Sequence, residues 1–340
     1  MSKLLSPLNL GGLTIKNRVV MPPMCMYKAR DNNGNPRCFH KVHYATRALG
    51  GVGLIIVEAT AVEPRGRITN ADLGLWSDEQ IHSHEKLVRE CKKFGSSVAV
   101  QLAHAGRKSQ CIDSKSVAPS SLRFGDSYNT PKELSSGEIE SIIESFVNSA
   151  KRAIRADYDM VEIHAAHGYL IHEFLSPLTN LRDDEYGGSF ENRVKILVKI
   201  MEKLRAENIK FGVRISADEW EVGGFDIRES RELAKIIEEN GSLYIHVSAG
   251  GNHEKPSLVP KFTPLYQCGY AKEIKKVVNI PVIAVGLITT PEEGEALLLD
   301  GVCDMVAYGR ELLRNPNLVQ FAMAKFDERD KLEKPYKRAF

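Results

Sequence analysis

The stretch VEIHAAHGYLIHEFLSP, residues 161–177, places three histidines, two glutamates and a tyrosine in a segment that begins with the apolar character of a buried strand. Two kinds of chemistry fit these residue types. His164, His167 and His172 could bind a metal ion together with the glutamates, since imidazole nitrogens and carboxylates are common ligands. Alternatively, His164 and His167 could donate hydrogen bonds to a bound organic molecule, with Tyr169 as a proton source.

The spacing of these residues favours the hydrogen-bond donors. Side chains alternate along a strand, so Glu162 and His164 would share the inward face, and His167 would lie on the first turn beyond it. His172 falls on a following turn or helix, where nothing forces it toward the other histidines, whereas a zinc site needs three or four converging ligands. We therefore expect no metal site. Structural, hydrogen-bonded positions are expected for His40, His43, His172 and His246.

Composition narrows the class of partner. The chain of 340 residues has 46 basic and 44 acidic residues, a formal charge of +2, and basic clusters mixed with acids. This balance argues against a nucleic-acid or membrane partner. The sequence has no basic-then-apolar leader and no apolar run of roughly 18–20 residues, so we expect a soluble, cytoplasmic protein. The six cysteines form no C-x-x-C pair, which indicates neither a disulfide framework nor a zinc or iron–sulfur cluster.

The elements that must position these side chains recur with a simple period. Eight times, a short β-branched run is followed by a loop and then by an amphipathic stretch with charges on one face. Near-continuous Val/Ile runs are typical of a parallel sheet covered by helices, and eight such units close into a (β/α)8 TIM barrel. A doubly wound open sheet is the rival, but its first strand usually leads into a Gly-rich turn, and here that strand leads into PPMCMY. The predicted strands span residues 18–24, 53–60, 97–102, 160–166, 210–216, 243–250, 281–288 and 305–310.

The remaining segments fit a single domain over residues 1–340. PLNLGGLTIKN has two short apolar runs about a Gly-Gly pair, which predicts a β-hairpin that covers the bottom of the barrel. Residues 103–134, rich in Ser, Pro, Asp and Gly, predict an excursion over the top. No linker marks a second domain, and residues 328–340 are expected to form a C-terminal tail.

A barrel carries its chemistry at the C-terminal ends of its strands, so the side chains there are the candidates for a site. The fifth strand delivers Arg214, the seventh Gly286, and the eighth Gly309 and Arg310. Glycine lets a ligand approach the backbone closely, and arginine suits bidentate contact with phosphate. Either loop alone could be a simple turn. Because barrels commonly bind phosphate after strands seven and eight, the pair predicts a phosphate site.

Four strings in this order closely resemble the Old Yellow Enzyme family of FMN-dependent ene-reductases. They are PLNLGGLTIKNRVVMPPMCMY, QLAHAGRKS, VEIHAAHGYLIHEFLSPLTNLRDDEYGGSFENRVK and AYGRELLRNP. The resemblance runs from about residue 3 to the C-terminus, and the third string is the most specific. Cys25 and its spacing to Tyr27 are similar to the cysteine-containing, thermophilic-like subclass. The four-cysteine iron–sulfur segment of the long dienoyl-CoA reductase relatives is absent, which implies a self-contained reductase.

The resemblance implies a reaction and a role for each candidate residue. NADPH or NADH would reduce non-covalent FMN in a ping-pong cycle, and reduced FMN would pass a hydride to the activated C=C bond of an α,β-unsaturated carbonyl or nitro compound. The histidine pair His164 and His167 would bind the carbonyl or nitro oxygen, and Tyr169 would protonate the product. The residues implied to contact FMN are Pro23, Met24, Cys25, Ala59, Gln101, Arg214, Gly286, Gly309 and Arg310.

Substrate contacts are implied for Tyr27, Lys108 and Arg338. In the subclass, the C-terminus crosses a dimer interface and an arginine enters the neighbouring active site; Arg338 matches that arginine, with Phe340 as an anchor. We therefore expect a homodimer or homotetramer. An exposed arginine on a loose tail is the alternative, and Lys108 could simply be solvated.

Two further alternatives concern the flavin contacts. Arg214 could form a salt bridge inside the barrel rather than bind the cofactor. Cys25 could sense redox state, tune the flavin or only fill space, and the absence of an adjacent partner cysteine favours tuning. At the level of function, the alternatives are an NAD(P)H oxidase that passes electrons to oxygen and a flavin-binding redox sensor that does not turn over.

Overall fold

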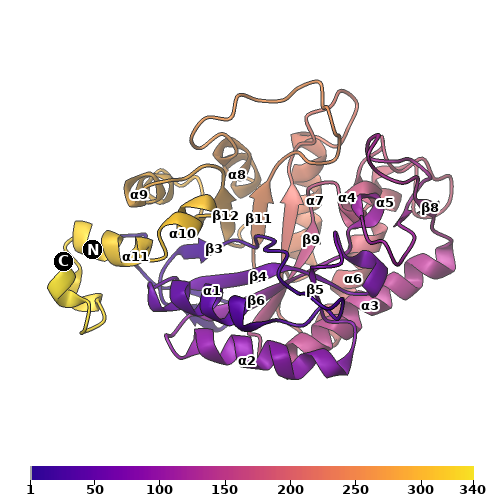
Figure 1. Ribbon diagram of the computed structural model, residues 1–340. Helices are drawn as coiled ribbons and strands as arrows, with labels where there is room; N and C mark the ends of the chain where they lie inside the picture. The colour runs from indigo at the N-terminus through magenta and orange to yellow at the C-terminus, as the bar shows by residue number, and fades with distance from the viewer. Residues whose placement is uncertain (1) are drawn as a thin grey trace.

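Parallel strands close into a barrel in the computed structural model, which describes residues 2–340 (Figure 1). The strands are hydrogen-bonded in the order β3-β13-β12-β11-β10-β9-β6-β4, and the pairing of β3 with β4 closes the ring. The (β/α)8 prediction is confirmed. The barrel strands are β3 (Val19–Met21), β4 (Leu54–Ala61), β6 (Ser97–Ala103), β9 (Met160–Ala165), β10 (Phe211–Ser216), β11 (Ile245–Ser248), β12 (Val282–Val285) and β13 (Met305–Ala307).

Helices cover the outside of the barrel (Figure 1). Nearly all residues of the barrel strands are buried, as expected for strands that have helices on one side and the barrel interior on the other. The helices are α1 (Cys38–Leu49), α2 (Ile81–Lys92), α3 (Ser136–Arg155), α4 (Leu170–Leu175), α5 (Phe190–Arg193), α6 (Lys195–Ala206), α7 (Ile227–Glu239), α8 (Cys268–Lys275), α9 (Pro291–Leu299), α10 (Arg310–Arg314) and α11 (Leu318–Lys325).

The predicted N-terminal hairpin is present and lies at one end of the barrel. β1 (Leu8–Leu10) pairs antiparallel with β2 (Leu13–Ile15). Leu10 and Ile15 belong to a buried cluster with inward-facing strand residues such as Ile56 and Met160. The hairpin therefore seals the end of the barrel at which the strands begin, and leaves the opposite end for a site.

The excursion after β6 lies over that opposite end. It contains the 3-10 turn η3 (Gly106–Lys108) and two short strands, β7 (Val117–Ala118) and β8 (Lys132–Glu133). Arg107 in η3 donates a hydrogen bond to the backbone carbonyl of Asn252, which follows β11, so the excursion contacts a loop on the far side of the barrel mouth.

Several predicted strands end earlier in the structure than the sequence pattern suggests. β12 ends at Val285, three residues before the apolar run does, because Gly286 and Leu287 have positive φ angles of 143° and 54° that no strand can contain. β11 ends at Ser248 for a related reason, since Gly250 has a φ of 74°. Because these strands end early, the loops that follow them bend toward the mouth of the barrel.

Side chains cap the starts of several helices. The Ser135 hydroxyl accepts a hydrogen bond from the backbone N–H of Glu138, and the Glu138 carboxylate accepts one from the backbone N–H of Ser135, which completes a capping box at the start of α3. The Asp226 side chain accepts from two backbone N–H groups at the start of α7. Across residues 2–340, no helix combines the length and apolar character needed to span a bilayer.

Candidate active site

Parallel register brings the predicted site residues to one level of the barrel. Arg214 of β10 lies opposite His164 of β9 on one side and His246 of β11 on the other. Gln101 of β6 lies opposite Glu162 in the same way. Because neighbouring residues in a parallel sheet point to the same face, all of these side chains face the barrel interior.

A buried carboxylate organises this level. Glu162 is fully buried and accepts hydrogen bonds from Gln101 Nε2 at 2.8 Å, His246 Nδ1 at 2.9 Å and the Tyr244 hydroxyl at 3.2 Å. These contacts satisfy its oxygens and fix the orientation of the Gln101 amide. His246 is therefore a structural histidine, as the sequence suggested.

His164 and His167 lie together at the end of β9, with ring centroids 5.2 Å apart. Burial lowers the pKa of both imidazoles well below the usual value, and the positive charge of Arg214 acts in the same direction. Both rings are therefore neutral near pH 7 and carry a single N–H each. His164 Nδ1 accepts from the backbone N–H of Ala166 at 3.2 Å, so its own proton is on Nε2.

A tight turn presents His167. This residue and Gly168 have φ angles of 60° and 70°, in the left-handed region that a non-glycine residue rarely adopts. The turn is held by the His167 backbone N–H, which donates to Ser216 Oγ at 2.9 Å, and by the Gly168 N–H, which donates to His172 Nδ1 at 2.9 Å. The His167 ring contacts Ser248 through Nε2, at 2.7 Å from Oγ.

Tyr169 completes the group. Its ring centroid lies 5.0 Å from that of His164, in an edge-to-face arrangement. Burial raises the pKa of Tyr169 well above its usual value, with smaller contributions from Cys25 and Tyr27. The phenol therefore keeps its proton throughout the neutral range and is available as an acid.

A cavity of about 260 Å³ adjoins this group, and its lining includes His167, Arg214, Ser248, Gly286 and Arg310. Arg214 is only 7% exposed, yet within residues 2–340 its guanidinium forms no hydrogen bond and no ion pair, and its Nε is a buried nitrogen without a partner. A buried cation without partners is costly, so the arrangement fits an anionic or strongly hydrogen-bonding ligand. The salt-bridge alternative for Arg214 finds no support among the described residues.

The predicted phosphate loops line the same cavity. Gly286 has a φ of 143° and approaches the backbone of Gln267 so closely that a Cβ atom there would lie 3.1 Å from its nitrogen. Gly309 lies beside Met24, since a Cβ at Gly309 would meet Met24 Sδ at 3.7 Å. Arg310 is exposed at the rim. The ends of the eighth and first barrel strands are therefore adjacent, as binding of one ligand by both requires.

The loop after β3 carries the other predicted flavin contacts. Pro23, Met24 and Cys25 are partly buried, and Tyr27 is exposed with a φ of 53°. Burial raises the pKa of Cys25 well above its usual value, so the residue is a thiol rather than a thiolate. All six cysteines are free.

Glu58 fixes this loop from the neighbouring strand. Its Oε2 accepts from the backbone N–H of Met26 at 2.8 Å, and its Oε1 accepts from the Tyr44 hydroxyl at 3.1 Å. The register of β4 shifts between Val57 and Thr60, which places Glu58 and the buried Ala59 at an irregularity in the strand. Such irregularities redirect side chains next to functional sites.

Sequence reasoning gave no role to three of the residues that hold the site together, Glu58, Ser216 and Ser248. Period-two alternation was the available signal for Ser216, since it follows the inward-facing Arg214 by two residues. Glu58 and Ser248 stand at strand ends, but their partners lie on other strands and are not visible in local sequence.

Two of the residues predicted to contact substrate, Lys108 and Arg338, lie in different parts of the molecule. Lys108 lies at the rim, with its ammonium group hydrogen-bonded to the backbone carbonyls of His167 and Gly251. Arg338 is exposed on η5 (Lys337–Ala339), and the neighbouring Phe340 packs edge-to-face on Phe321 of α11. Arg338 therefore sits with the outer helix α11 rather than with the site residues of its own chain.

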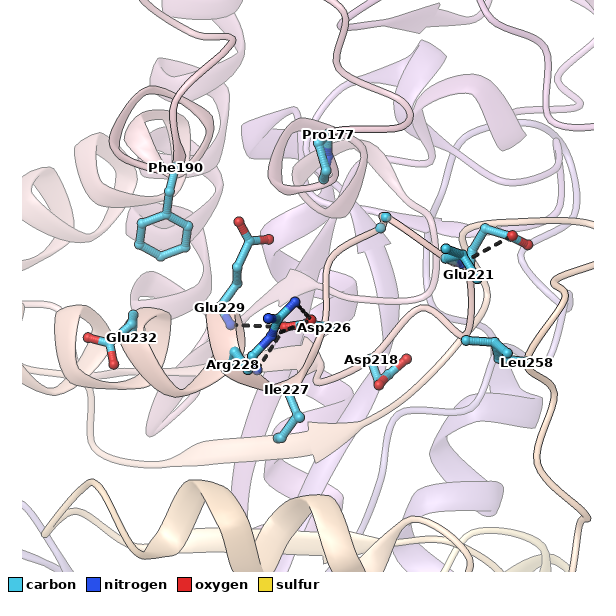
Figure 2. A pocket seen from close by; sticks show the side chains of 13 residues that line it. Pro177, Phe190, Asp218, Glu221, Asp226, Ile227, Arg228, Glu229, Glu232 and Leu258 are labelled. Atoms are coloured by element: carbon cyan, nitrogen blue, oxygen red, sulfur yellow. Dashed lines mark hydrogen bonds and ion pairs between the residues drawn. The ribbon is translucent and has the colours of Figure 1, made fainter.

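A second cavity, of about 900 Å³, lies beside the start of α7 and contains none of the predicted site residues (Figure 2). Its charged lining is mainly acidic, with the carboxylates Asp218, Glu221, Asp226, Glu229 and Glu232 against the single cation Arg228, which is paired with Asp226. An acidic lining repels phosphate, so this cavity does not suit a phosphorylated cofactor. Residues 2–340 contain no group of three or more His, Cys, Asp or Glu side chains placed to hold a metal ion.

Comparison with known proteins agrees with this geometry. The model of the NADH:flavin oxidoreductase / NADH oxidase family matches residues 3–328. The chain is 47% identical over 317 residues to an NADPH dehydrogenase of Geobacillus sp. (strain WCH70), covering 92% of this chain and 91% of that protein. It is 44% identical over 316 residues to an NADPH dehydrogenase of Bacillus subtilis (strain 168), covering 92% of both.

Solved structures give the same result. An Old Yellow Enzyme homologue from Zymomonas mobilis has a TM-score of 0.82 at 29% identity, covering 95% of this chain and 92% of that one. Morphinone reductase in complex with tetrahydroNAD has a TM-score of 0.79 at 30% identity, covering 98% and 92%.

Proposed function

Since the chain belongs to the Old Yellow Enzyme family and is an FMN-dependent NAD(P)H oxidoreductase, we propose that it reduces activated C=C bonds of α,β-unsaturated carbonyl or nitro compounds. The observation that carries the proposal is the cluster of two neutral histidines and a protonated tyrosine beside the cavity that contains Arg214. This cluster combines hydrogen-bond donors with a proton source, which is what reduction of such a bond needs.

His164 and His167 bind the carbonyl or nitro oxygen of the substrate in this proposal. Negative charge develops on that oxygen as the alkene is reduced. One imidazole N–H from each ring, held in a largely dry site, would stabilise the charge by about 3 kcal/mol per donor. His164 contributes Nε2–H, because Nδ1 is occupied by Ala166 N–H.

Tyr169 protonates Cα of the substrate. A buried phenol is a weak acid, but the carbanion that it meets is far more basic, so transfer is favourable. The edge-to-face contact with His164 supports this role, because the phenol ring lies next to one of the two histidines proposed to bind the substrate oxygen.

FMN, when bound, supplies the hydride that is added to Cβ. The residues that would hold it are Pro23, Met24, Cys25, Ala59, Gln101 and Arg214 at the ring, and Gly286, Gly309 and Arg310 at the phosphate. Support for Arg214 comes from its buried and unpartnered guanidinium, and support for the glycines comes from their place in the cavity lining.

Substrate contacts at the rim are proposed for Tyr27 and for Arg338 of a second copy in a homodimer or homotetramer. Tyr27 is exposed at the mouth, where it can meet a ligand without rearrangement. Lys108 is also proposed to contact substrate at the rim, and its ammonium group donates hydrogen bonds to the backbone carbonyls of His167 and Gly251.

The test is an absorbance spectrum of the purified holoenzyme, followed by anaerobic titration with NADPH and NADH and reoxidation by cyclohexenone or by oxygen. Rapid reoxidation by the enone, at least tenfold faster than by air-saturated buffer, is expected. Reoxidation by oxygen alone would make the protein an oxidase, and a flavin that no acceptor reoxidises would indicate a sensor.

A further inference from the structure

Lys108 lies where the β6 excursion crosses the turn that carries the catalytic candidates. Its Nζ donates to the backbone carbonyl oxygens of His167 and Gly251, each at 3.0 Å. The same ammonium group lies 5.0 Å from the centre of the Tyr169 ring and 4.4 Å from the centre of the Phe124 ring. One cation therefore contacts three separate segments of the barrel mouth.

The two carbonyls belong to backbone in an unusual conformation. His167, Gly168 and Gly251 have φ angles of 60°, 70° and 92°. The two turns are in direct contact, since a Cβ on Gly168 would lie 2.3 Å from the Gly251 carbonyl oxygen. A left-handed histidine persists only when its surroundings fix it, so the contacts of this turn decide where the His167 ring points.

Two further hydrogen bonds of the turn act on its N–H groups. Ser216 and His172 accept from the N–H groups of His167 and Gly168, and both are uncharged partners. On the carbonyl side of His167, the hydrogen bond is supplied by Lys108. Hydrogen bonds from an ammonium ion are roughly twice as strong as those from a neutral donor, so we expect Lys108 to hold this turn more strongly than either of these N–H contacts does.

From this geometry we infer that Lys108 is a positioning residue: its ammonium ion ties the His167–Tyr169 turn to the Gly251 loop and offsets the negative charge left on Tyr169 after proton donation. The inference rests on the proposed function for its effect on turnover. Cations are attracted to the face of an aromatic ring, and the attraction increases when that ring becomes a phenolate.

The charge of this group responds to pH. Burial lowers the pKa of Lys108 to about 8, with Glu173 opposing the shift and Arg107 adding to it. The charged and titratable groups around it are Arg107 on η3, Glu173 and His172 on α4, and His164, His167 and Tyr169 on the turn; Gly251 and Phe124 add no charge. Glu173 also has a pKa that burial raises to about 8, so a test must separate the two groups.

The test compares the wild-type holoenzyme with Lys108→Met, Lys108→Arg and Lys115→Met, an exposed lysine on the same excursion that serves as the matched control. The rate constant for reoxidation of the NADPH-reduced enzyme by cyclohexenone is measured from pH 6 to 10. The wild type and Lys115→Met should be fastest below about pH 8 and slow down above it. Lys108→Met should be about tenfold slower at pH 7 and lack that decline.

Lys108→Arg separates Lys108 from Glu173, because a guanidinium does not lose its proton in this range. It should keep most of the activity at pH 7 and lose the decline above pH 8. A decline that persists in both Lys108 variants would assign it to Glu173 and overturn the inference, as would a Lys108→Met enzyme with the wild-type rate at pH 7.

Amide hydrogen exchange of the holoenzyme gives a readout that does not depend on the reaction. Peptides that cover residues 164–172 and 249–253 should exchange at least tenfold faster in Lys108→Met than in Lys115→Met, while the peptide that covers β4 stays unchanged. Equal exchange in the two variants would remove the positioning role, even if the enzyme proved to reduce no enone at all.

Discussion

The protonation states of His164 and His167 decide how they can act. Both are neutral, so each offers one N–H to an oxygen and cannot deliver a proton without passing through an unfavourable anion. In the proposed mechanism, proton donation is therefore assigned to Tyr169, and stabilisation of the developing charge is assigned to the two histidines. This division of labour makes separable predictions for the two halves of the cycle.

For the histidines, His164→Ala or His167→Ala should slow reoxidation by cyclohexenone by about 100-fold, because one of two preorganised donors is lost. Stopped-flow absorbance of the flavin measures this rate, and reduction by NADPH should change little. His82→Ala, which alters an exposed histidine on α2, is the matched control. An unchanged affinity of the double variant for a phenolic inhibitor would contradict the assignment.

For Tyr169, removal of the hydroxyl in Tyr169→Phe should slow only the oxidative half-reaction, by about 100-fold, since only that half consumes its proton. Both half-reactions are followed separately under anaerobic conditions. Tyr270→Phe on α8 should leave both rates at their wild-type values. Equal slowing of the two halves in Tyr169→Phe would mean that the tyrosine has another role.

For Cys25, the raised pKa predicts low reactivity toward electrophiles. Iodoacetamide at pH 7.5 should modify the exposed Cys38 at least tenfold faster than Cys25 in the holoenzyme, as peptide mass spectrometry would measure. Cys25→Ala should shift the midpoint potential of the flavin and retain the cofactor. Faster modification of Cys25 than of Cys38 would support the alternative hypothesis that Cys25 senses redox state.

The sequence could predict residues whose role follows from their own position in a strand. His164 and Arg214 are examples, because alternation alone makes them inward-facing. It could not predict Lys108 as a contact of the His167 carbonyl, since the two residues are 59 positions apart and meet only when the barrel closes. The left-handed φ of His167 is likewise set by tertiary contacts rather than by local propensity.

At the scale of elements, the capping box of α3 offers a clean stability test. Ser135→Ala should lower the free energy of unfolding by about 1 kcal/mol, because a backbone N–H at the helix start loses its acceptor. Urea denaturation of the holoenzyme measures the change. Ser141→Ala is the control, since that exposed hydroxyl only bonds back to the Gly137 carbonyl within the helix and should have an effect near zero.

Element types were easier to predict from sequence than element ends. The Val/Ile runs of β4 and β6 coincide with observed strands to within one residue at either end, because burial on both faces leaves a continuous apolar signal. The run at residues 281–288 continues past the end of β12, since Leu287 and Ile288 remain partly or fully buried in a turn. Hydrophobicity indicates that a residue is buried. After Val285 the backbone changes direction while the residues stay buried, so hydrophobicity does not show where the strand ends.

At the scale of the whole molecule, the position of the C-terminal tail predicts a shared site. Arg338 lies with α11 and away from the site residues of its own chain, so in the proposed shared site it would enter the cavity of a second copy. Deletion of residues 336–340 should raise the KM for cyclohexenone severalfold while FMN stays bound.

Sedimentation of the full-length protein should accompany the kinetics. Arg155→Ala, which alters an exposed arginine of α3 paired with Asp78, serves as the control for loss of a surface charge. A monomer at micromolar concentration, or a truncated enzyme with an unchanged KM, would exclude a shared site.

The unpartnered guanidinium of Arg214 has a consequence for folding itself. Burial separates this charge from water, and within residues 2–340 no hydrogen bond or ion pair engages the guanidinium, although the charge of Glu162 acts on it from farther away. The remaining penalty disfavours the native state of the apoprotein, and in the proposed site FMN would relieve it. Ligands that bind only the native state raise its apparent stability in proportion to the logarithm of their concentration. The melting temperature should therefore rise with added FMN, and Arg214→Met should narrow the gap between the apoprotein and the holoprotein. In a cell, the abundance of this enzyme would then depend on the supply of FMN. The apoprotein unfolds more often than the holoprotein, and proteases cleave the unfolded chain.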